Sequence, residues 1–192
     1  MSEEQLITLL KEGNPEAFRG LIEQLKNKVF NTALGIVQNT EDAEDIAQEV
    51  FVEIFQSIQQ FKGDAKLTTW VYRITFTKSL EFLRKKKSKK RFAFVQSLFA
   101  GDSVLPIEDK PHFYHPGVQL ENKERAAVLF NAIEQLPDNQ KTAFVLHKLE
   151  RLSYVEICDV MLVSLSSVES LMFRAKQNLQ KLLSDYYEKN EK

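Results

Sequence analysis

The spacing of the apolar residues constrains the fold of this chain most strongly. Between Ala17 and Val37 they recur every three or four positions, which is the repeat of one face of an α-helix. The repeat returns between Ala43 and Ile58 and again after Trp70. Only 6 Gly and 5 Pro occur in 192 residues, so few residues interrupt these helices. We therefore predict an all-α protein.

The helical repeat fails once, in the middle of the chain. Residues 92–122 lack it, and Gly and Pro are scattered there among apolar and acidic residues. Such a stretch is typical of a linker rather than of a packed domain. We predict two small helical domains, residues 1–92 and residues 122–192, joined by a flexible linker over residues 93–121.

The charges of the chain are unevenly distributed. The net charge is −1, from 26 Lys and Arg against 27 Asp and Glu. Residues 1–70 carry a net charge of −6 and residues 71–91 a net charge of +8, whereas residues 123–192 are neutral. A chain with this balance is not a general polyanion binder, and we expect its segments to meet different partners.

The basic segment adjoins an aromatic and polar helical face within Phe61–Arg91. Four side chains fall on one side of the helix predicted there: Trp70, Arg73, Thr77 and Arg84. Seven of the eight residues 84–91 are basic. Bases stack on aromatic rings and phosphates bind Lys and Arg, so the segment indicates nucleic-acid binding. An ordinary core Trp followed by a solvated helix end is the alternative.

A second polar face belongs to the helix predicted over residues 41–60. Its side chains are mostly acids and amides: Asp45, Gln48, Glu49, Glu53 and Gln56. A solvated surface is the simplest interpretation. A carboxylate metal site is poorly supported, because no histidine is near in sequence and the acids lie opposite the apolar stripe.

Two capping boxes predict a helix-turn-helix near the carboxyl terminus. Ser153 and Glu156 begin a short helix, and after a tight turn Ser166 and Glu169 begin a longer one that runs to about Leu183. The short helix should pack on the long one through Ile157, Val160 and Met161 against Val168, Met172 and Ala175. The long helix would present Leu165, Ser166, Ser167, Glu169, Ser170, Phe173, Arg174 and Gln177. Because the turn lacks glycine, a plain helical hairpin is the alternative.

Other classes of function are poorly supported by the sequence. The single cysteine, Cys158, offers neither a disulfide framework nor a zinc cluster. His112 and His115 form H-x-x-H without a third ligand nearby, so we predict no metal site. No nucleophile–base pair or phosphate-cradling glycine loop occurs, so we predict no enzyme and no cofactor. An acidic amino terminus without a long apolar run favours a cytoplasmic protein that does not insert into membranes.

Four stretches of the chain together resemble a known family. They are DAEDIAQEVF (Asp42–Phe51), FKGDAKLTTWVYRI (Phe61–Ile74), LPDNQKTAFVLHKLERLSYVEI (Leu136–Ile157) and FRAKQNL (Phe173–Leu179). In this order they are similar to bacterial RNA polymerase sigma factors of the extracytoplasmic-function group, which retain conserved regions 2 and 4. The resemblance implies a protein that binds core RNA polymerase and directs promoter recognition, promoter melting and transcription initiation. Residues 1–92 would be the region 2 domain and residues 122–192 the region 4 domain.

The resemblance assigns a partner to each polar face. The clamp helices of the polymerase β′ subunit would bind Asp45, Gln48, Glu49 and Glu53. The minus-ten element, with a flipped base, would bind Lys62, Lys66, Leu67, Trp70, Arg73, Thr77, Arg84, Lys85 and Lys86. The minus-thirty-five element would bind Ser164, Ser166, Ser167, Glu169, Ser170, Arg174 and Lys176, in a domain that also leans on the β flap. An anti-sigma factor is the expected regulator.

The sequence departs from the family pattern at the residues that read DNA. Thr77 stands where the family commonly has Asn, and Leu162 stands at the usual turn glycine. Glu169 and Leu171 occupy positions where Lys and Arg are common. The recognised promoter sequences therefore cannot be copied from relatives. A polymerase-independent helix-turn-helix regulator with a sensing or dimerisation domain is the alternative, but it leaves the polar face of residues 41–60 without a role.

Overall fold

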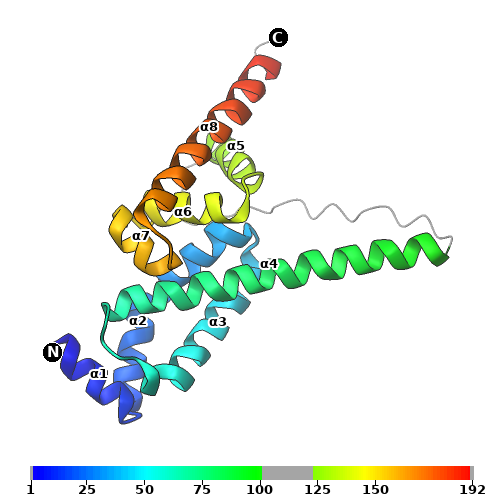
Figure 1. Ribbon diagram of the computed structural model, residues 1–192. Coiled ribbons are helices and arrows are strands. Elements are labelled where there is room, and N and C mark those ends of the chain that lie inside the picture. The colour runs from blue at the N-terminus through cyan, green and yellow to red at the C-terminus, as the bar shows by residue number, and fades with distance from the viewer. Residues whose placement is uncertain (1, 101–122, 191–192) are drawn as a thin grey trace.

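The chain folds into two groups of helices that contact each other (Figure 1). The computed structural model describes residues 2–100 and 123–190. The first group holds α1 (Glu3–Lys11), α2 (Pro15–Val37), α3 (Thr40–Ser57), the 3₁₀ helix η1 (Ile58–Gln60) and α4 (Leu67–Ala100). The second holds α5 (Lys123–Glu134), α6 (Asp138–Lys148), α7 (Tyr154–Met161) and α8 (Leu165–Asn190). Helices are the only regular secondary structure of the described ranges, which confirms the all-α prediction.

Side-chain caps begin the helices of the first group. Asn14 accepts hydrogen bonds from two backbone N–H groups at 3.0 Å, and Pro15 occupies the first helical position of α2. Asn39 caps α3 by accepting a hydrogen bond from the Asp42 N–H at 2.8 Å. These caps satisfy donors that a helix leaves without intrahelical partners, so both helices begin at defined residues.

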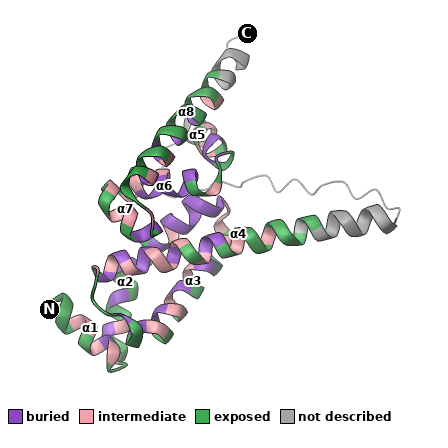
Figure 2. Cartoon of the chain, viewed as in Figure 1, coloured by how far each residue is buried: buried purple, intermediate pink, exposed green. Residues whose placement is uncertain are grey.

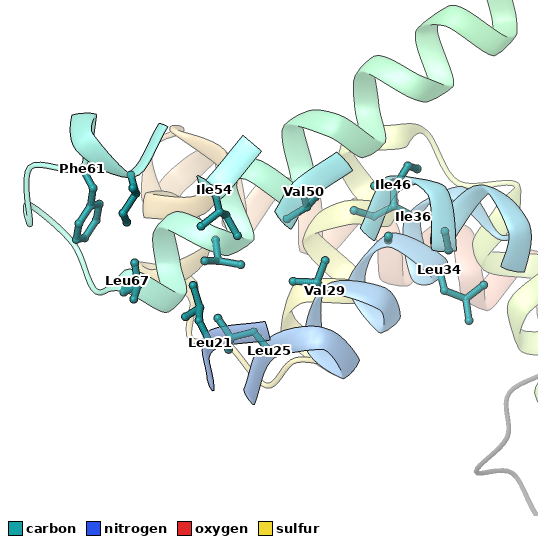
Figure 3. Packing of buried hydrophobic residues seen from close by; sticks show 14 of the residues in the cluster. Leu21, Leu25, Val29, Leu34, Ile36, Ile46, Val50, Ile54, Phe61 and Leu67 are labelled. Atoms are coloured by element: carbon teal, nitrogen blue, oxygen red, sulfur yellow. The ribbon is translucent and has the colours of Figure 1, made fainter. Parts of the chain in front are cut away.

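The apolar faces of α2, α3 and α4 form the first core (Figure 3). Val29, Val50 and Ile54 lie at its centre and are at most 1% exposed. The helical repeat in the sequence predicted this burial on α2 and α3. Because the interior is close-packed, truncating Ile54 to alanine would cost about 2–5 kcal/mol of stability.

The long helix α4 extends beyond its predicted limits at both ends. It begins at Leu67 instead of near Trp70, and it continues to Ala100, past the predicted domain boundary at residue 92. The Leu67 N–H donates a hydrogen bond to the Glu3 carboxylate at 2.6 Å. A cap supplied from a distant part of the chain leaves no local signal, which explains the earlier start of the helix.

The helices of the second group form a separate core. As predicted, Ile157, Val160 and Met161 of α7 pack with Val168 and Met172 of α8. Ala175 instead packs with the buried residues of α5 and the turn after it: Ala132, Ile133 and Leu136. α8 also continues to Asn190, beyond the predicted end near Leu183.

The two groups meet where α6 and α7 lie against α2 and α4 (Figure 1). Every residue from Thr32 to Gln38 is buried, on all sides of α2 (Figure 2). A helix covered by a single core would leave one side exposed, so this turn of α2 lies between the two cores. Tyr72 of α4 is 6% exposed and packs into the second core. Within the described ranges, no helix is long and apolar enough to cross a membrane.

Candidate nucleic-acid and polymerase interfaces

The residues predicted to bind polymerase lie on the solvent side of α3. Asp45, Gln48 and Glu49 are exposed, while Glu53 is half-buried and pairs with Lys78 of α4, with 3.0 Å between Nζ and Oε2. The hydrogen bond from Lys78 to Glu53 raises the pKa of the lysine, which keeps this link between α3 and α4 charged. The structure therefore brings the four predicted residues to one face, where Asp45 and Glu49 supply exposed negative charge.

An apolar strip continues this acidic face. Val52 is 55% exposed and Phe55 is 60% exposed, although the helical repeat had placed Phe55 in the core stripe. The Phe55 ring lies 4.9 Å from the ring of Phe18 on α2, and Ile22 of α2 is also exposed. Exposed aromatic and aliphatic side chains beside polar ones are typical of protein-binding surfaces. Sequence periodicity cannot reveal this strip, because it assigns apolar residues to the interior.

The predicted minus-ten residues of the loop before α4 and of its first turn differ in exposure. Lys62 and Lys66 are exposed, next to the turn at Gly63, whose φ of 81° favours glycine. Leu67 is only 3% exposed and belongs to the first core, so its side chain packs beneath the loop. Trp70 is half-buried, and its ring lies 5.1 Å from the buried ring of Phe61.

Helix α1 holds both ends of the loop that joins η1 to α4. Lys11 Nζ donates to the Phe61 carbonyl at 2.8 Å, and the Gln59 amide donates to the Lys11 carbonyl. At the other end, the Glu3 carboxylate accepts from the Leu67 N–H. The partners of these contacts lie far apart in the chain, so no local sequence pattern predicts them. The loop carrying Lys62 and Lys66 is thereby clamped between two points on one helix.

The predicted DNA-binding face of α4 is partly engaged by the second domain. Thr77, Arg84 and Lys85 are exposed, and Lys86 pairs with Asp42 of α3 at 2.9 Å. Arg73 instead donates from Nε and Nη2 to the backbone carbonyl of Asp159 on α7, at 3.1 and 2.6 Å. The face is therefore open toward its carboxyl-terminal end and covered near Arg73.

A buried hydrogen bond accompanies this cover. The Tyr72 hydroxyl donates to the Glu150 carboxylate, which follows α6, at 2.7 Å. Burial raises the pKa of Glu150, against the opposing influence of this hydrogen bond and of Lys28. Burial also raises the pKa of Tyr72, and the neighbouring Glu150 adds to the shift, so the hydroxyl remains a donor.

The second domain contains the predicted helix-turn-helix. Ser153 and Glu156 form the expected capping box, but Ser164 caps α8 in place of Ser166. The helix therefore begins at Leu165, two residues before the start that a Ser166 cap predicts. The Ser164 hydroxyl also lies 3.0 Å from that of Ser166 and 2.8 Å from that of Ser167. The hydroxyl groups of these serines therefore interact with one another at the start of α8, where the resemblance also places their contacts with DNA. The remaining predicted residues are exposed along α8: Glu169, Ser170, Arg174 and Lys176.

The turn between α7 and α8 uses a leucine where glycine is favoured. Leu162 has a φ of 56°, in the left-handed region, and is 70% exposed. The missing glycine left a helical hairpin as the alternative in the sequence. Because Leu162 adopts the conformation that glycine would, the turn forms without it.

The residues the structure describes contain no group of three His, Cys, Asp or Glu side chains arranged to hold a metal ion. The H-x-x-H pair, His112 and His115, lies outside these residues.

Together, the fold and these faces define a helical protein with a DNA-binding helix-turn-helix in its second half. The family model of sigma-70 region 2 matches residues 21–89, and that of sigma-70 region 4 matches residues 126–179. The chain belongs to the sigma-70 family of RNA polymerase sigma factors, in its extracytoplasmic-function (ECF) group. It therefore binds core RNA polymerase and directs promoter recognition, promoter melting and transcription initiation.

Similar proteins cover nearly the whole chain. The ECF RNA polymerase sigma factor SigW of Bacillus subtilis is 30% identical over 183 residues, which span 93% of this chain and 95% of SigW. The RNA polymerase sigma-H factor of Pseudomonas aeruginosa is 29% identical over 190 residues, spanning 94% and 93% of the two chains.

Solved structures share the fold at lower identity. CnrH, in complex with the cytosolic domain of CnrY, is 19% identical with a TM-score of 0.68 and covers 95% of this chain and 97% of its own. RpoE of Bartonella quintana, in complex with the anti-sigma factor NepR, is 18% identical with a TM-score of 0.64 and covers 87% and 96%.

Proposed function

We propose that three faces of this sigma factor each bind a different part of the transcription complex. The acidic face of α3, made by Asp45, Gln48, Glu49 and Glu53, docks on the β′ clamp helices of core polymerase. The exposed cations before and along α4, with Trp70, Arg73 and Thr77, bind the minus-ten element. Leu67, which the resemblance also assigns to this element, is buried in the first core, so we assign it the support of the loop.

The second domain, residues 122–192, reads the minus-thirty-five element with α8. Glu169, Ser170, Arg174 and Lys176 face solvent along the helix, and Ser166 and Ser167 lie at its start. Serine can read base edges, glutamate can accept from cytosine, and the basic residues can bind phosphate. Residues 1–92 form the region 2 domain and residues 93–121 the linker in this proposal, although α4 itself continues to Ala100.

The separation of charge carries this proposal. The acidic α3 face and the basic segment of α4 are adjacent on the first core, where DNA and a basic protein surface can be bound at once without competing. A free chain with a net charge of −1 gains little from phosphate neutralisation. We therefore expect weak promoter binding by the protein alone and specific binding only with core polymerase.

We also propose that the protein works in the cytoplasm, has no catalytic activity of its own and is held inactive by an anti-sigma factor. The two solved structures of similar fold are complexes, one with the cytosolic domain of CnrY and one with the anti-sigma factor NepR. The exposed apolar strip of Val52 and Phe55 gives an anti-sigma factor a surface to bind on the free protein, in the absence of DNA.

Transcription from a genomic library tests the proposal without knowledge of the promoter. Fragments of the encoding genome are transcribed by core polymerase with and without the protein, and the RNA 5′ ends are sequenced. We expect new start sites that share two upstream elements only when the protein is added. Equal transcription with and without it would refute the proposed function and favour a polymerase-independent regulator. The strongest promoter found this way supplies DNA for the later assays.

A further inference from the structure

The loop that carries Lys62 and Lys66 depends on its two ends for its position. Lys62, Gly63 and Asp64 are exposed. Among the residues that the structure describes, none forms a hydrogen bond with residues 62–65. A loop without such bonds does not hold a single conformation by itself, so whatever fixes its ends also decides where its cations point.

Both ends of this loop are buried, and both are held by α1. The side chains of Phe61 and Leu67 are 5% and 3% exposed and lie in the first core (Figure 3). The Phe61 carbonyl accepts a hydrogen bond from Lys11 Nζ at 2.8 Å, and the Leu67 N–H donates to the Glu3 carboxylate at 2.6 Å. One helix thereby holds the point where the loop leaves the core and the point where it returns.

Lys11 is the cation that holds the first of these points. It lies in the last turn of α1, where the helix dipole favours a positive charge, so a solvated helix end is the simpler explanation. Its contacts argue for more, because Lys11 is half-buried, its carbonyl accepts the Gln59 amide and its ammonium reaches a carbonyl 50 residues away. The neighbouring Leu10 is fully buried in the first core, which fixes the orientation of α1.

The same end of the loop supports the aromatic residue of the minus-ten face. The buried Phe61 ring lies 5.1 Å from the ring of Trp70, which is half-buried. A displacement of the Phe61 backbone would therefore move the loop and the Trp70 ring together. Unstacking a base costs free energy that its pocket must offset, so a pocket that is already in place binds the base better.

We propose that Lys11 is a positioning residue for the base that is flipped out of the minus-ten element. It holds the Phe61 carbonyl while Glu3 holds Leu67, and together they keep the loop and Trp70 in the arrangement that accepts the base. This role deepens the proposed function of the minus-ten face and rests on it. Lys11 acts only through these neighbours, so its loss should slow promoter opening and reduce base selectivity without weakening the binding of core polymerase.

Two substitutions of Lys11 test this role. Lys11→Met keeps the aliphatic stem and removes the donor, whereas Lys11→Arg keeps a charged donor. Lys26→Met is the matched control, since Lys26 is exposed on α2 and pairs with Glu23. Permanganate reactivity over time measures promoter opening by each holoenzyme, and fluorescence anisotropy measures affinity for core polymerase. We expect Lys11→Met to open the promoter about fivefold more slowly, Lys11→Arg to recover most of this rate, and all variants to bind core polymerase equally.

An abasic promoter separates positioning of the base from a general loss of structure. Abasic nucleotides are placed one at a time along the nontemplate strand of a premelted minus-ten element. The position at which wild-type holoenzyme loses most affinity identifies the flipped base. We expect holoenzyme with Lys11→Met to bind the intact premelted promoter about fivefold more weakly than wild type, but to bind the promoter that is abasic at this position equally well. Exchanging the flipped base for the other three should change the affinity of Lys11→Met less than that of wild type.

The proposal is overturned if Lys11→Met opens the promoter as fast as Lys26→Met, or if it binds the abasic promoter as poorly, relative to wild type, as it binds the intact one. Hydrogen exchange of the free protein tests the contact without DNA. The amides at the loop ends, Phe61 and Leu67, should exchange faster in Lys11→Met than in Lys26→Met, and equal exchange would show that Lys11 does not hold the loop. Failure of the wild type in the genomic-library assay would instead refute the proposed function, and the exchange rates would still decide whether Lys11 holds the loop.

Discussion

Leu162 adopts a left-handed backbone conformation at the turn of the helix-turn-helix. This conformation costs a side chain about 1 kcal/mol relative to glycine, and the exposed Leu162 recovers little by burial. We expect Leu162→Gly to raise the free energy of unfolding by about 1 kcal/mol in urea denaturation. Leu165→Gly, in the first turn of α8, should lower it by about 0.5–1 kcal/mol. A loss of stability in Leu162→Gly would show that the leucine side chain contributes to the turn.

Glu3 acts at a distance on the loop that carries Lys62 and Lys66. Its carboxylate holds the first N–H of α4, at Leu67, so its loss should loosen one end of the loop. We expect Glu3→Ala to reduce promoter opening several-fold, measured by permanganate reactivity, with unchanged affinity for core polymerase. Glu4→Ala is the control, because its side chain is exposed on the same helix. Equal opening by the two variants would contradict a positioning role for α1.

Single residues also show where sequence reasoning ends. The exposure of Thr77 and Glu169 followed from helical periodicity alone, and that of Lys62 from its place in a loop. The burial of Leu67 and the exposure of Phe55 did not, because each depends on how far the neighbouring helices reach. Periodicity gives the direction of a side chain on its own helix, and tertiary packing decides what covers it.

At the scale of elements, α3 and the loop before α4 can be tested separately. The double variant Gln48→Ala/Glu49→Ala removes two exposed groups from α3, so we expect about tenfold weaker binding to core polymerase. Lys62→Ala removes one exposed cation, so promoter opening should fall several-fold while binding to core polymerase is kept. Fluorescence anisotropy with labelled protein measures the first effect and permanganate footprinting the second. If both variants lose both activities in proportion, the two faces are not independent.

The helices themselves were largely predictable, and their limits less so. α2 and α7 begin where Asn14 and Ser153 supply local caps, which a sequence displays. α4 begins where Glu3 supplies a cap from another helix, and no local pattern marks that residue. The docking of α6 and α7 on α2 and α4 was not predictable from the sequence either. Tyr72 fits the apolar repeat of its helix whether it packs in the first core or in the second, so the repeat does not reveal the docking.

At the scale of the whole molecule, α6 and α7 lie on α2 and α4 in a closed state, and the two domains separate in an open state. We expect the balance between these two states to depend on pH through Glu150. Burial in the closed state raises the pKa of this carboxyl above its usual value of 4.5. The closed state therefore binds the proton more tightly than the open state. Its advantage is fully present below the pKa of the open state and is lost as the pH rises through the higher pKa of the closed state. Burial and the neighbouring Glu150 raise the pKa of Tyr72, so its hydroxyl stays protonated throughout.

The radius of gyration of the free protein, followed by small-angle X-ray scattering, checks this dependence. We expect expansion as the pH rises from about 4.5 through the raised pKa of Glu150. Glu150→Gln should remove the expansion and hold the protein closed at neutral pH. The glutamine side-chain oxygen can still accept the hydrogen bond from the Tyr72 hydroxyl, and no charge is buried. Asp138→Asn removes the ion pair with Lys87 and leaves Glu150 in place, so this variant isolates the contribution of that ion pair to the docking of the two domains. A radius that rises equally in wild type and Glu150→Gln would show that another group opens the two domains.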